Sequence, residues 1–396
     1  MHLFRKPAAH IAVIGFVASL LVVWPEPAMA RMAPETLADR EPVRAGPVEP
    51  GFPIDYLGVL WDAAGGDDNA AAAGATTPHG EVRFRTGGGW GPWIPLTGDG
   101  LEDDGQWASA LMPGGGADAY QVRGIPPEAV DPQAVPINTT SGPLVQVGEQ
   151  AGGAARAIDS AMCRSRADWG ADETLRLGAD GDAKWPPEFH DTQVMTVHHT
   201  VTSNDDPDPE ATVRAIYRYH AVDRGWGDIG YHYLIDEAGV VYEGRWSGTT
   251  SASCEGAVGA DGSDFAHEDG TDRVVTAAHT AGRNAGHLGV ALLGEFTDHP
   301  SRGADPTPGA VNALEDLLAE LALRHGLDPL AKVDYVNPVS GGRATVDTIG
   351  GHRDHAGTDC PGERLYGQLP GIRENVATKM AMSRDNAPSV PAAARQ

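Results

Sequence analysis

The sequence predicts an α/β protein in which a mixed β-sheet is covered by helices and preceded by a small all-β, sandwich-like domain. Two observations carry this prediction. Between about 53 and 137, short β-rich segments are separated by clusters of Gly, Pro, Asp and Asn, without a helical period of useful length. From Cys163 onward, β-rich segments alternate with segments of helical period.

The first domain is expected to consist of short strands. In one segment Val82 and Phe84 alternate with charged neighbours, as in a half-buried strand. The expected strands are 56–61, 81–85, 93–96 and 119–125. Three tryptophans of this region, Trp61, Trp90 and Trp93, could stack on sugars, but no metal ligands or paired carboxylates lie nearby. We therefore interpret them as core residues that supply large buried area.

In the second domain the clearest element is a helix from 308 to about 325, with leucines on one face and Gly326 just after its end. A second helix is expected from 209 to about 220, with Asp208 as N-cap and Pro209 at its first position. One or two closing helices are expected between 361 and 381. The expected strands are 194–198, 231–235, 240–243, 288–296 and 346–349.

The first thirty residues have the pattern of an export signal. Arg5 and Lys6 form a basic start, an apolar run follows from 11 to 24, and Ala28-Met29-Ala30 has the form of a cleavage site. The run is shorter than the ~20 apolar residues of a membrane span. We therefore predict a secreted, extracellular protein, with association with the cell wall as a further expectation and no membrane insertion after signal cleavage.

The expected organisation follows from these changes in composition. The predicted segments are a signal peptide (1–30), a flexible leader (31–52), the β-domain (53–140), a linker (141–162), the α/β domain (163–381) and a disordered tail (382–396).

The charge balance excludes one class of partner. There are 55 acidic and 29 basic residues, a net charge of −26. Nucleic acid needs a basic surface, so it is not an expected partner. Charge-driven docking on an anionic membrane is disfavoured for the same reason.

Four residues in the second half suggest the chemistry: His198, Tyr231, His352 and Cys360. Two imidazoles and a thiolate form a tridentate set for Zn²⁺ that leaves a fourth position for water, as in catalytic rather than structural sites. A nearby tyrosine could stabilise the oxyanion formed when a carbonyl is attacked. The pattern indicates a zinc hydrolase that cleaves an amide.

The residues alone leave two choices in this set open. His198 and His199 are adjacent, and in a strand they point to opposite faces, so only one of them can readily reach a metal. His355 lies in the same loop as His352, and spacing does not decide between them.

There are three cysteines, and in an exported chain an odd number leaves one unpaired. Cys360, close to His352 in the chain, is assigned to the metal. Cys163 and Cys254 are then predicted to form a disulfide.

A series of motifs identifies the second domain as resembling the peptidoglycan recognition proteins and the zinc-dependent N-acetylmuramoyl-L-alanine amidases of type 2. The resemblance covers roughly 163–380. The matching motifs are S-R-A-D-W-G-A-D, V-H-H-T, G-W-G-D-I-G-Y-H-Y-L-I, V-Y-E-G-R, A-A-H-T-A-G-R-N, L-G-V-A-L-L-G-E-F and G-H-R-D-H-A-G-T-D-C-P-G. The resemblance implies cleavage of the amide between N-acetylmuramic acid and L-alanine, with peptidoglycan or muropeptides as partners.

Carried over by position, the resemblance implies that His198, His352 and Cys360 bind zinc, while His199 and His355 do not. Tyr231 and Thr358 fall where catalytic members assist the reaction.

The implied substrate contacts are His279 and Asn284, with Trp226 and Arg245 as further candidates. The general base is open among Tyr231, His232 and a water relay. The stretch 247–272 is longer than usual in the family and is interpreted as an inserted surface loop.

Two rival functions remain. The first is a recognition protein that binds peptidoglycan without cleaving it; such members typically lack the cysteine ligand, which this chain keeps. The second is a zinc peptidase, which is disfavoured because the H-E-x-x-H motif is absent.

Overall fold

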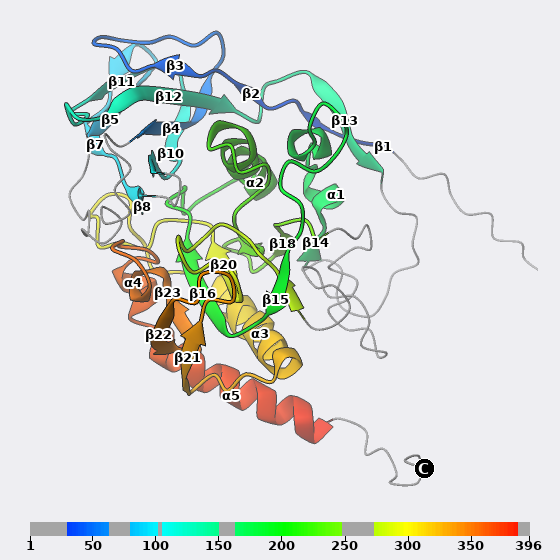
Figure 1. Ribbon diagram of the computed structural model, residues 1–396. Coiled ribbons are helices and arrows are strands. Elements are labelled where there is room, and N and C mark those ends of the chain that lie inside the picture. Colours follow the sequence, from blue (N-terminus) through cyan, green and yellow to red (C-terminus); the bar gives the residue numbers. More distant parts are fainter. Residues whose placement is uncertain (1–29, 63–79, 102–104, 150–162, 248–272, 387–396) are drawn as a thin grey trace, which may run out of the picture.

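The structure is a computed structural model that describes residues 30–62, 80–101, 105–149, 163–247 and 273–386 (Figure 1). Most of the predicted signal peptide, part of the predicted linker and the predicted inserted loop with Cys254 lie outside these ranges. Within the described ranges, no helix is both long and apolar enough to cross a bilayer.

The described residues between 30 and 149, here called the β-region, contain strands but no helix. Their strands are β1 (Ala30–Pro34), β2 (Leu37–Ala38), β3 (Glu41–Pro42), β4 (Ile54–Asp62), β5 (Glu81–Thr86), β6 (Gly89–Trp90), β7 (Ile94–Pro95), β8 (Gly98–Leu101), β9 (Gln106–Ser109), β10 (Met112–Ala117), β11 (Ala119–Arg123), β12 (Val130–Asn138) and β13 (Leu144–Glu149). One sheet has the order β2-β12-β4-β9-β8, with β10 added to β4 and β3 to β12. A smaller sheet has the order β11-β5-β6, with β7 added to β5.

These two sheets share a core that includes Leu57, Val59, Phe84 and Tyr120. The four strands expected from the sequence coincide with β4, β5, β7 and β11. That the β-region is a separate domain remains a prediction.

The predicted leader and linker both contain strands. β2 and β3 pair with β12, while β1 pairs with β13, which lies inside the predicted linker. Backbone pairing supplies the hydrogen bonds of such edge strands, so side-chain periodicity was a poor guide to them.

The expectation that the three tryptophans are core residues is right for only one of them. Trp61 is 5% exposed and stacks on Trp107 at 3.9 Å between ring centroids. Trp90 and Trp93 are only partly buried, and both pack on the Arg83 guanidinium. The Arg83 Cζ lies 4.7 Å from the ring centroid of Trp90 and 4.6 Å from that of Trp93. They lie on the surface of the smaller sheet, where cation–π contact rather than core packing holds them.

A six-stranded mixed sheet forms the centre of the second half, as expected. Its order is β14-β18-β17-β20-β16-β23, with β17 and β18 antiparallel and the other neighbours parallel. The strands are β14 (Cys163–Arg164), β16 (Val194–His199), β17 (Tyr233–Ile235), β18 (Val241–Glu243), β20 (His287–Leu292) and β23 (Ile349–Gly351). Two further antiparallel pairs lie outside this sheet: β15 (Phe189–Asp191) with the distant β19 (Arg273–Val275), and the hairpin of β21 (Lys332–Val336) with β22 (Arg343–Asp347).

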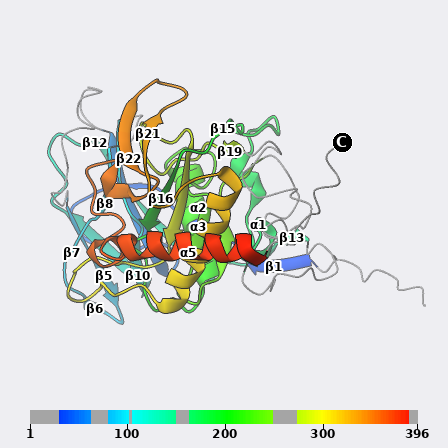
Figure 2. The same cartoon turned by 90° about the horizontal axis from the view of Figure 1, so that it is seen from below.

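One face of this sheet is covered by α3 (Pro308–His325) and α5 (Leu369–Asn386), which lie together in Figure 2. The predicted bounds of α3 are confirmed: Thr307 caps its start and Gly326 ends it in the left-handed region at φ 64°. Met195, Val197 and Val290 from the sheet pack against Leu314 and Leu318. The short helix α4 (Glu363–Tyr366) precedes α5.

The opposite face is covered by α2 (Pro209–Arg218), with the short helix α1 (Arg166–Trp169) beside it, and α2 in turn is covered by the β-region (Figure 1). Leu234 and Ala291 of the sheet, Val213 of α2, and Tyr56 and Leu60 of β4 belong to one apolar core. Because β4 also contributes to the core of the β-region, both of its faces are buried. The β-region is therefore packed onto the α/β part through a continuous apolar core.

Candidate metal centre

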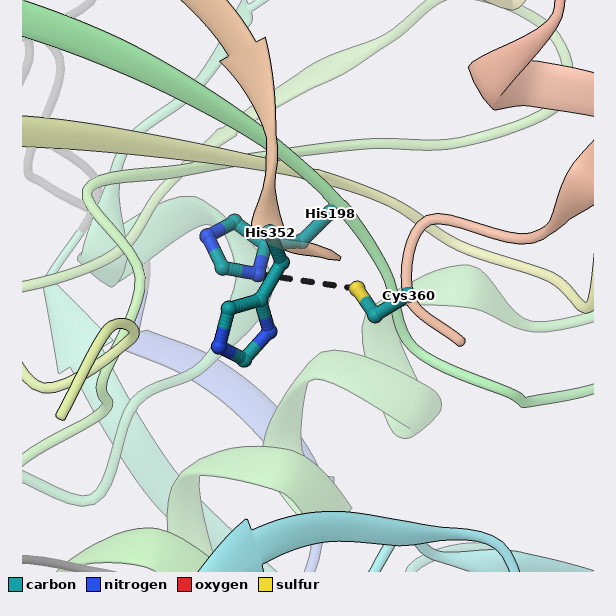
Figure 3. A group of neighbouring side chains, drawn as sticks. All are labelled: His198, His352 and Cys360. Carbon is teal, nitrogen blue, oxygen red and sulfur yellow. Dashed lines mark hydrogen bonds between the residues drawn. The ribbon is translucent and has the colours of Figure 1, made fainter. Parts of the chain in front are cut away.

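Two neighbouring parallel strands bring the three predicted ligands to one edge of the central sheet. His198 is near the end of β16, His352 begins the 3₁₀ turn directly after β23, and Cys360 follows in the same loop. All three side chains are buried, and their candidate ligand atoms lie within 4.8 Å of one another (Figure 3). Strands that run parallel end at the same edge, which is why residues so distant in sequence meet.

The alternation of β16 separates the two adjacent histidines as predicted. His199 lies on the side of Phe296, and its Nδ1 accepts a hydrogen bond from the Phe296 amide at 3.3 Å. Its own amide donates to Cys360 Sγ at 3.3 Å. His199 therefore orients the thiol through its backbone, while its ring is engaged on the other side of the strand.

A chain of hydrogen bonds determines which nitrogen of His198 can bind a metal. His279 Nε2 lies 3.4 Å from the His287 carbonyl, which can only accept, so this nitrogen carries the proton. In a neutral His279 ring Nδ1 is then an acceptor, and His198 Nε2 lies 3.0 Å from it in position to donate its proton, with the Thr280 hydroxyl 2.9 Å from the same nitrogen. His198 Nδ1 is left with a lone pair, 3.6 Å from Cys360 Sγ.

Burial keeps these rings neutral, which is the form that binds metals. Burial lowers the pKa of His198 well below its usual range, and the neighbouring His352 lowers it further. Burial also lowers the pKa of His352 to about 3, with a smaller contribution from His355.

The residues present fit a divalent metal. His352 Nδ1 is buried and has no hydrogen-bond partner among the described residues. His198 Nδ1 and Cys360 Sγ lie close to it. Two neutral imidazoles and a thiol are a donor set that zinc prefers, and three protein ligands leave one position open.

The competitor His355 does not join this group. Its ring packs edge-on against His287, with 5.0 Å between the ring centroids. The spacing of the sequence could not decide between His352 and His355, and the turn after β23 does so by directing the two rings apart.

Tyr231 and Thr358 each contact one of the candidate metal ligands. Tyr231 is 7% exposed, and its ring centroid is 5.3 Å from that of His198. Thr358 lies in the loop that carries Cys360, and its hydroxyl accepts a hydrogen bond from the Cys360 amide at 3.2 Å.

Among the predicted substrate contacts, His279 and Asn284 lie behind the metal group. His279 is 6% exposed and contacts His198 as described. The Asn284 side-chain oxygen Oδ1 accepts from the backbone amides of His279 and Thr280, at 2.9 and 2.8 Å. Both residues therefore support the position of His198.

The two further candidates differ. Arg245 is 1% exposed, and its guanidinium is engaged by Asp228 at 2.9 Å and by the Trp185 carbonyl at 2.8 Å. This buried ion pair fits a structural role rather than substrate contact. Trp226 is partly exposed and packs on His220, with 4.7 Å between the ring centroids.

The candidate general base His232 is fully engaged. It is 0% exposed, its Nε2 donates to the Val275 carbonyl at 2.7 Å, and its Nδ1 accepts from the Gly289 amide at 2.9 Å. Neither ring nitrogen is left to move a proton, which leaves Tyr231 or a water relay.

Cys360 is a buried thiol that is not part of a disulfide, and Cys163 is disulfide-bonded. Its predicted partner, Cys254, lies outside the described residues, so that pairing remains a prediction.

The sequence did not indicate a set of residues beside Tyr231. A π-helical turn, Tyr219–Asp223, extends α2 and closes with a hydrogen bond from the Arg224 amide to the Tyr219 carbonyl at 2.8 Å. Such insertions occur often at functional sites. Here it places Tyr219 and His220 at a hollow that Tyr231 also lines. Only a three-dimensional structure brings these residues together with the β-region.

Fold and site thus define a mixed-sheet protein with a buried His/His/Cys group able to bind a metal. Residues 188–363 match the sequence profile of the N-acetylmuramoyl-L-alanine amidase family.

The same part of the chain is similar to several named proteins. An N-acetylmuramoyl-L-alanine amidase of Homo sapiens is 32% identical over 186 residues, which are 44% of this chain and 23% of the relative. Peptidoglycan-recognition protein LB of Drosophila melanogaster is 24% identical over 215 residues, 54% of this chain and 69% of that protein. The chain thus spans about a quarter of the length of the human relative. The solved structure of wild-type Drosophila PGRP-LB aligns with a TM-score of 0.35 and 23% identity, over 52% of this chain and 91% of that one.

Proposed function

We propose that this protein is an exported zinc-dependent amidase that cleaves the bond between N-acetylmuramic acid and L-alanine of peptidoglycan. The observation that carries the proposal is the convergence of His198, His352 and Cys360, with His352 Nδ1 buried and without a hydrogen-bond partner among the described residues. The match of residues 188–363 to the amidase family suggests the substrate class.

In this proposal each residue has a defined task. His198 Nδ1, His352 Nδ1 and Cys360 Sγ hold the metal, and His279 fixes the tautomer of His198. Zn²⁺ bound there supplies a Lewis acid and an activated water. The Tyr231 hydroxyl donates a hydrogen bond to the developing oxyanion. The Thr358 hydroxyl holds the Cys360 loop by accepting a hydrogen bond from the Cys360 amide. Thr358 also assists Tyr231 beside the substrate carbonyl.

The alternative is a protein that recognises peptidoglycan without cleaving it. The complete set of metal-binding side chains favours catalysis, because binding a glycan or peptide does not require a buried thiol beside two imidazoles.

The direct test is mass spectrometry of the soluble products after the zinc-loaded protein digests purified peptidoglycan, with a chelated sample as control. We expect metal-dependent release of free peptides that begin with L-alanine. Intact peptidoglycan with bound protein would instead establish the recognition function, and new amine ends elsewhere in the peptide would indicate a peptidase.

A further inference from the structure

A small hollow lies between the β-region and the amidase-family segment. Its wall on the side of the β-region is made by Ala110 and Leu111, which connect β9 to β10. The opposite wall is made by Ile216, Tyr219 and Tyr231. The two parts of the chain therefore build this hollow together.

The hollow is adjacent to the candidate metal centre. Tyr231 lines it, and the ring of Tyr231 is 5.3 Å from that of His198. Thr200, two residues after His198, also lines it. A substrate whose carbonyl lies at the metal would extend into this space.

The wall from the β-region is held in a fixed place. The Tyr219 hydroxyl donates to the Ser109 carbonyl at 3.1 Å, directly before Ala110. The Tyr219 ring also packs on Gly58 of β4, where an added Cβ would lie 2.3 Å from Tyr219 Cε2. A hydrogen bond joins the hydroxyls of Tyr56 and Thr212. Ala110 and Leu111 are 6% and 4% exposed, so they cannot move aside freely.

The size and lining of the hollow limit what it can hold. Its volume is ≈ 20 Å³, little more than one water molecule needs. Apolar and polar groups line it in about equal measure. The lining residues with polar side-chain atoms are Thr200, Tyr219, His220 and Tyr231, and two of them are engaged: the Tyr219 hydroxyl donates to the Ser109 carbonyl, and His220 Nδ1 accepts from the Gly230 amide at 3.1 Å. A methyl-sized apolar substituent suits this space better than a charged or long one.

We propose that Ala110 and Leu111 are specificity-determining residues, which form the wall of a subsite for the methyl group beside the scissile amide. This inference rests on the proposed function. Two methyl groups flank that amide, on the lactyl group of muramic acid and on L-alanine, and both have the chemistry that the hollow accepts. The β-region then contributes to substrate selection at the metal.

The test compares substrates on the zinc-loaded full-length protein. One series of synthetic N-acetylmuramoyl peptides carries glycine, L-alanine or L-valine at the first position, and a second series lacks the lactyl methyl. The wild type should prefer the methyl-bearing substrate by about 10-fold in kcat/KM, the usual effect of one methyl in an apolar pocket. Leu111→Ala should enlarge the hollow and raise the valine-to-alanine ratio about 10-fold. Ala110→Val should raise KM for the alanine substrate more than for the glycine substrate.

The matched control is Leu57→Ala, which truncates a fully buried leucine of the β-region that belongs to a different core. It should change stability but no ratio between substrates. Each ratio compares two substrates on one protein sample, so a smaller fraction of folded protein lowers both values equally and cancels from the ratio.

The outcomes separate the two proposals. If the ratios change in the first series, the alanyl methyl occupies the hollow. If they change in the second series, the lactyl methyl occupies it. Unchanged ratios in both series for Leu111→Ala and Ala110→Val overturn the inference. If the wild type binds these substrates without cleaving them, the proposed function fails. The inference is then decided by the ratios of the dissociation constants for the same substrates, measured by calorimetry.

Discussion

The two faces of the central sheet are built from different kinds of residues. The face under α3 and α5 packs apolar side chains such as Leu288, Leu314 and Leu318. The face under α2 and the β-region also contains Tyr231, and at its edge lie the candidate metal ligands. In β16, consecutive residues serve both faces: Val197 belongs to the first core, while His198 belongs to the metal group. We therefore expect that stability and chemistry can be perturbed separately in this sheet.

The largest expected effect comes from removing a metal ligand. His352→Asn should abolish cleavage, because zinc affinity should fall by more than the ~10–100-fold typical of a residue that only supports a ligand. Bound zinc is measured by elemental analysis and cleavage by product release. The matched control is His355→Asn in the same loop, which should keep both. Equal losses in the two variants would contradict the choice of His352.

The next effect should come from Tyr231. Tyr231→Phe keeps the ring and removes the hydroxyl, so kcat should fall by about 10²–10³-fold, as for a lost oxyanion donor. The control is Tyr233→Phe, a tyrosine in the core under α3, which should leave kcat unchanged. A Tyr231→Phe variant with wild-type kcat would remove the hydroxyl from the mechanism.

A smaller effect should follow from His279. His279→Phe removes the acceptor of the His198 Nε2 proton, so the affinity for zinc should fall about 10–100-fold. The readout is competition with a chromophoric chelator. At saturating zinc, kcat should remain near the wild-type value. A large loss of kcat with unchanged affinity would instead support the substrate contact predicted from the sequence.

The pH dependence of stability should reflect the buried histidines. Burial lowers the pKa of His199 and His352 to about 3, so these rings stay neutral in the folded protein and gain protons on unfolding below about pH 6.5. Their contribution to stability is present above pH 6.5 and is lost as the pH falls toward 3. Urea unfolding of the metal-free protein at pH 7.5, 6 and 5 should show falling stability. A constant value would contradict the neutral buried state.

The smallest effect on cleavage should come from the other face. Leu318→Ala should lower the free energy of unfolding by about 2–5 kcal/mol, because a fully buried leucine of α3 is truncated. Per folded molecule, kcat should not change. A reduced kcat in fully folded protein would show that the two faces are not separable.

The sequence could predict what depends on local pattern. The bounds of α3, the alternation that separates His198 from His199, and the central mixed sheet follow from periodicity and capping. The ligand set also needed a family resemblance, because spacing alone does not distinguish His352 from His355.

Contacts between distant segments could not be predicted. Nothing local to β1–β3 indicated that they pair with β12 and β13. The place of His279 behind His198 and of Leu111 beside Tyr231 depends on packing across more than eighty residues of chain. The burial of Arg245 follows from its pairing with Asp228, which its motif does not reveal.

The measurement that tests the central claim most directly is a crystal structure of the zinc-loaded protein with anomalous scattering at the zinc edge. We expect one peak at this edge of the sheet, about 2.0–2.1 Å from His198 Nδ1 and His352 Nδ1 and about 2.3 Å from Cys360 Sγ. A peak bound by His355 or His199, or a zinc-loaded protein without a peak between these three side chains, would contradict it.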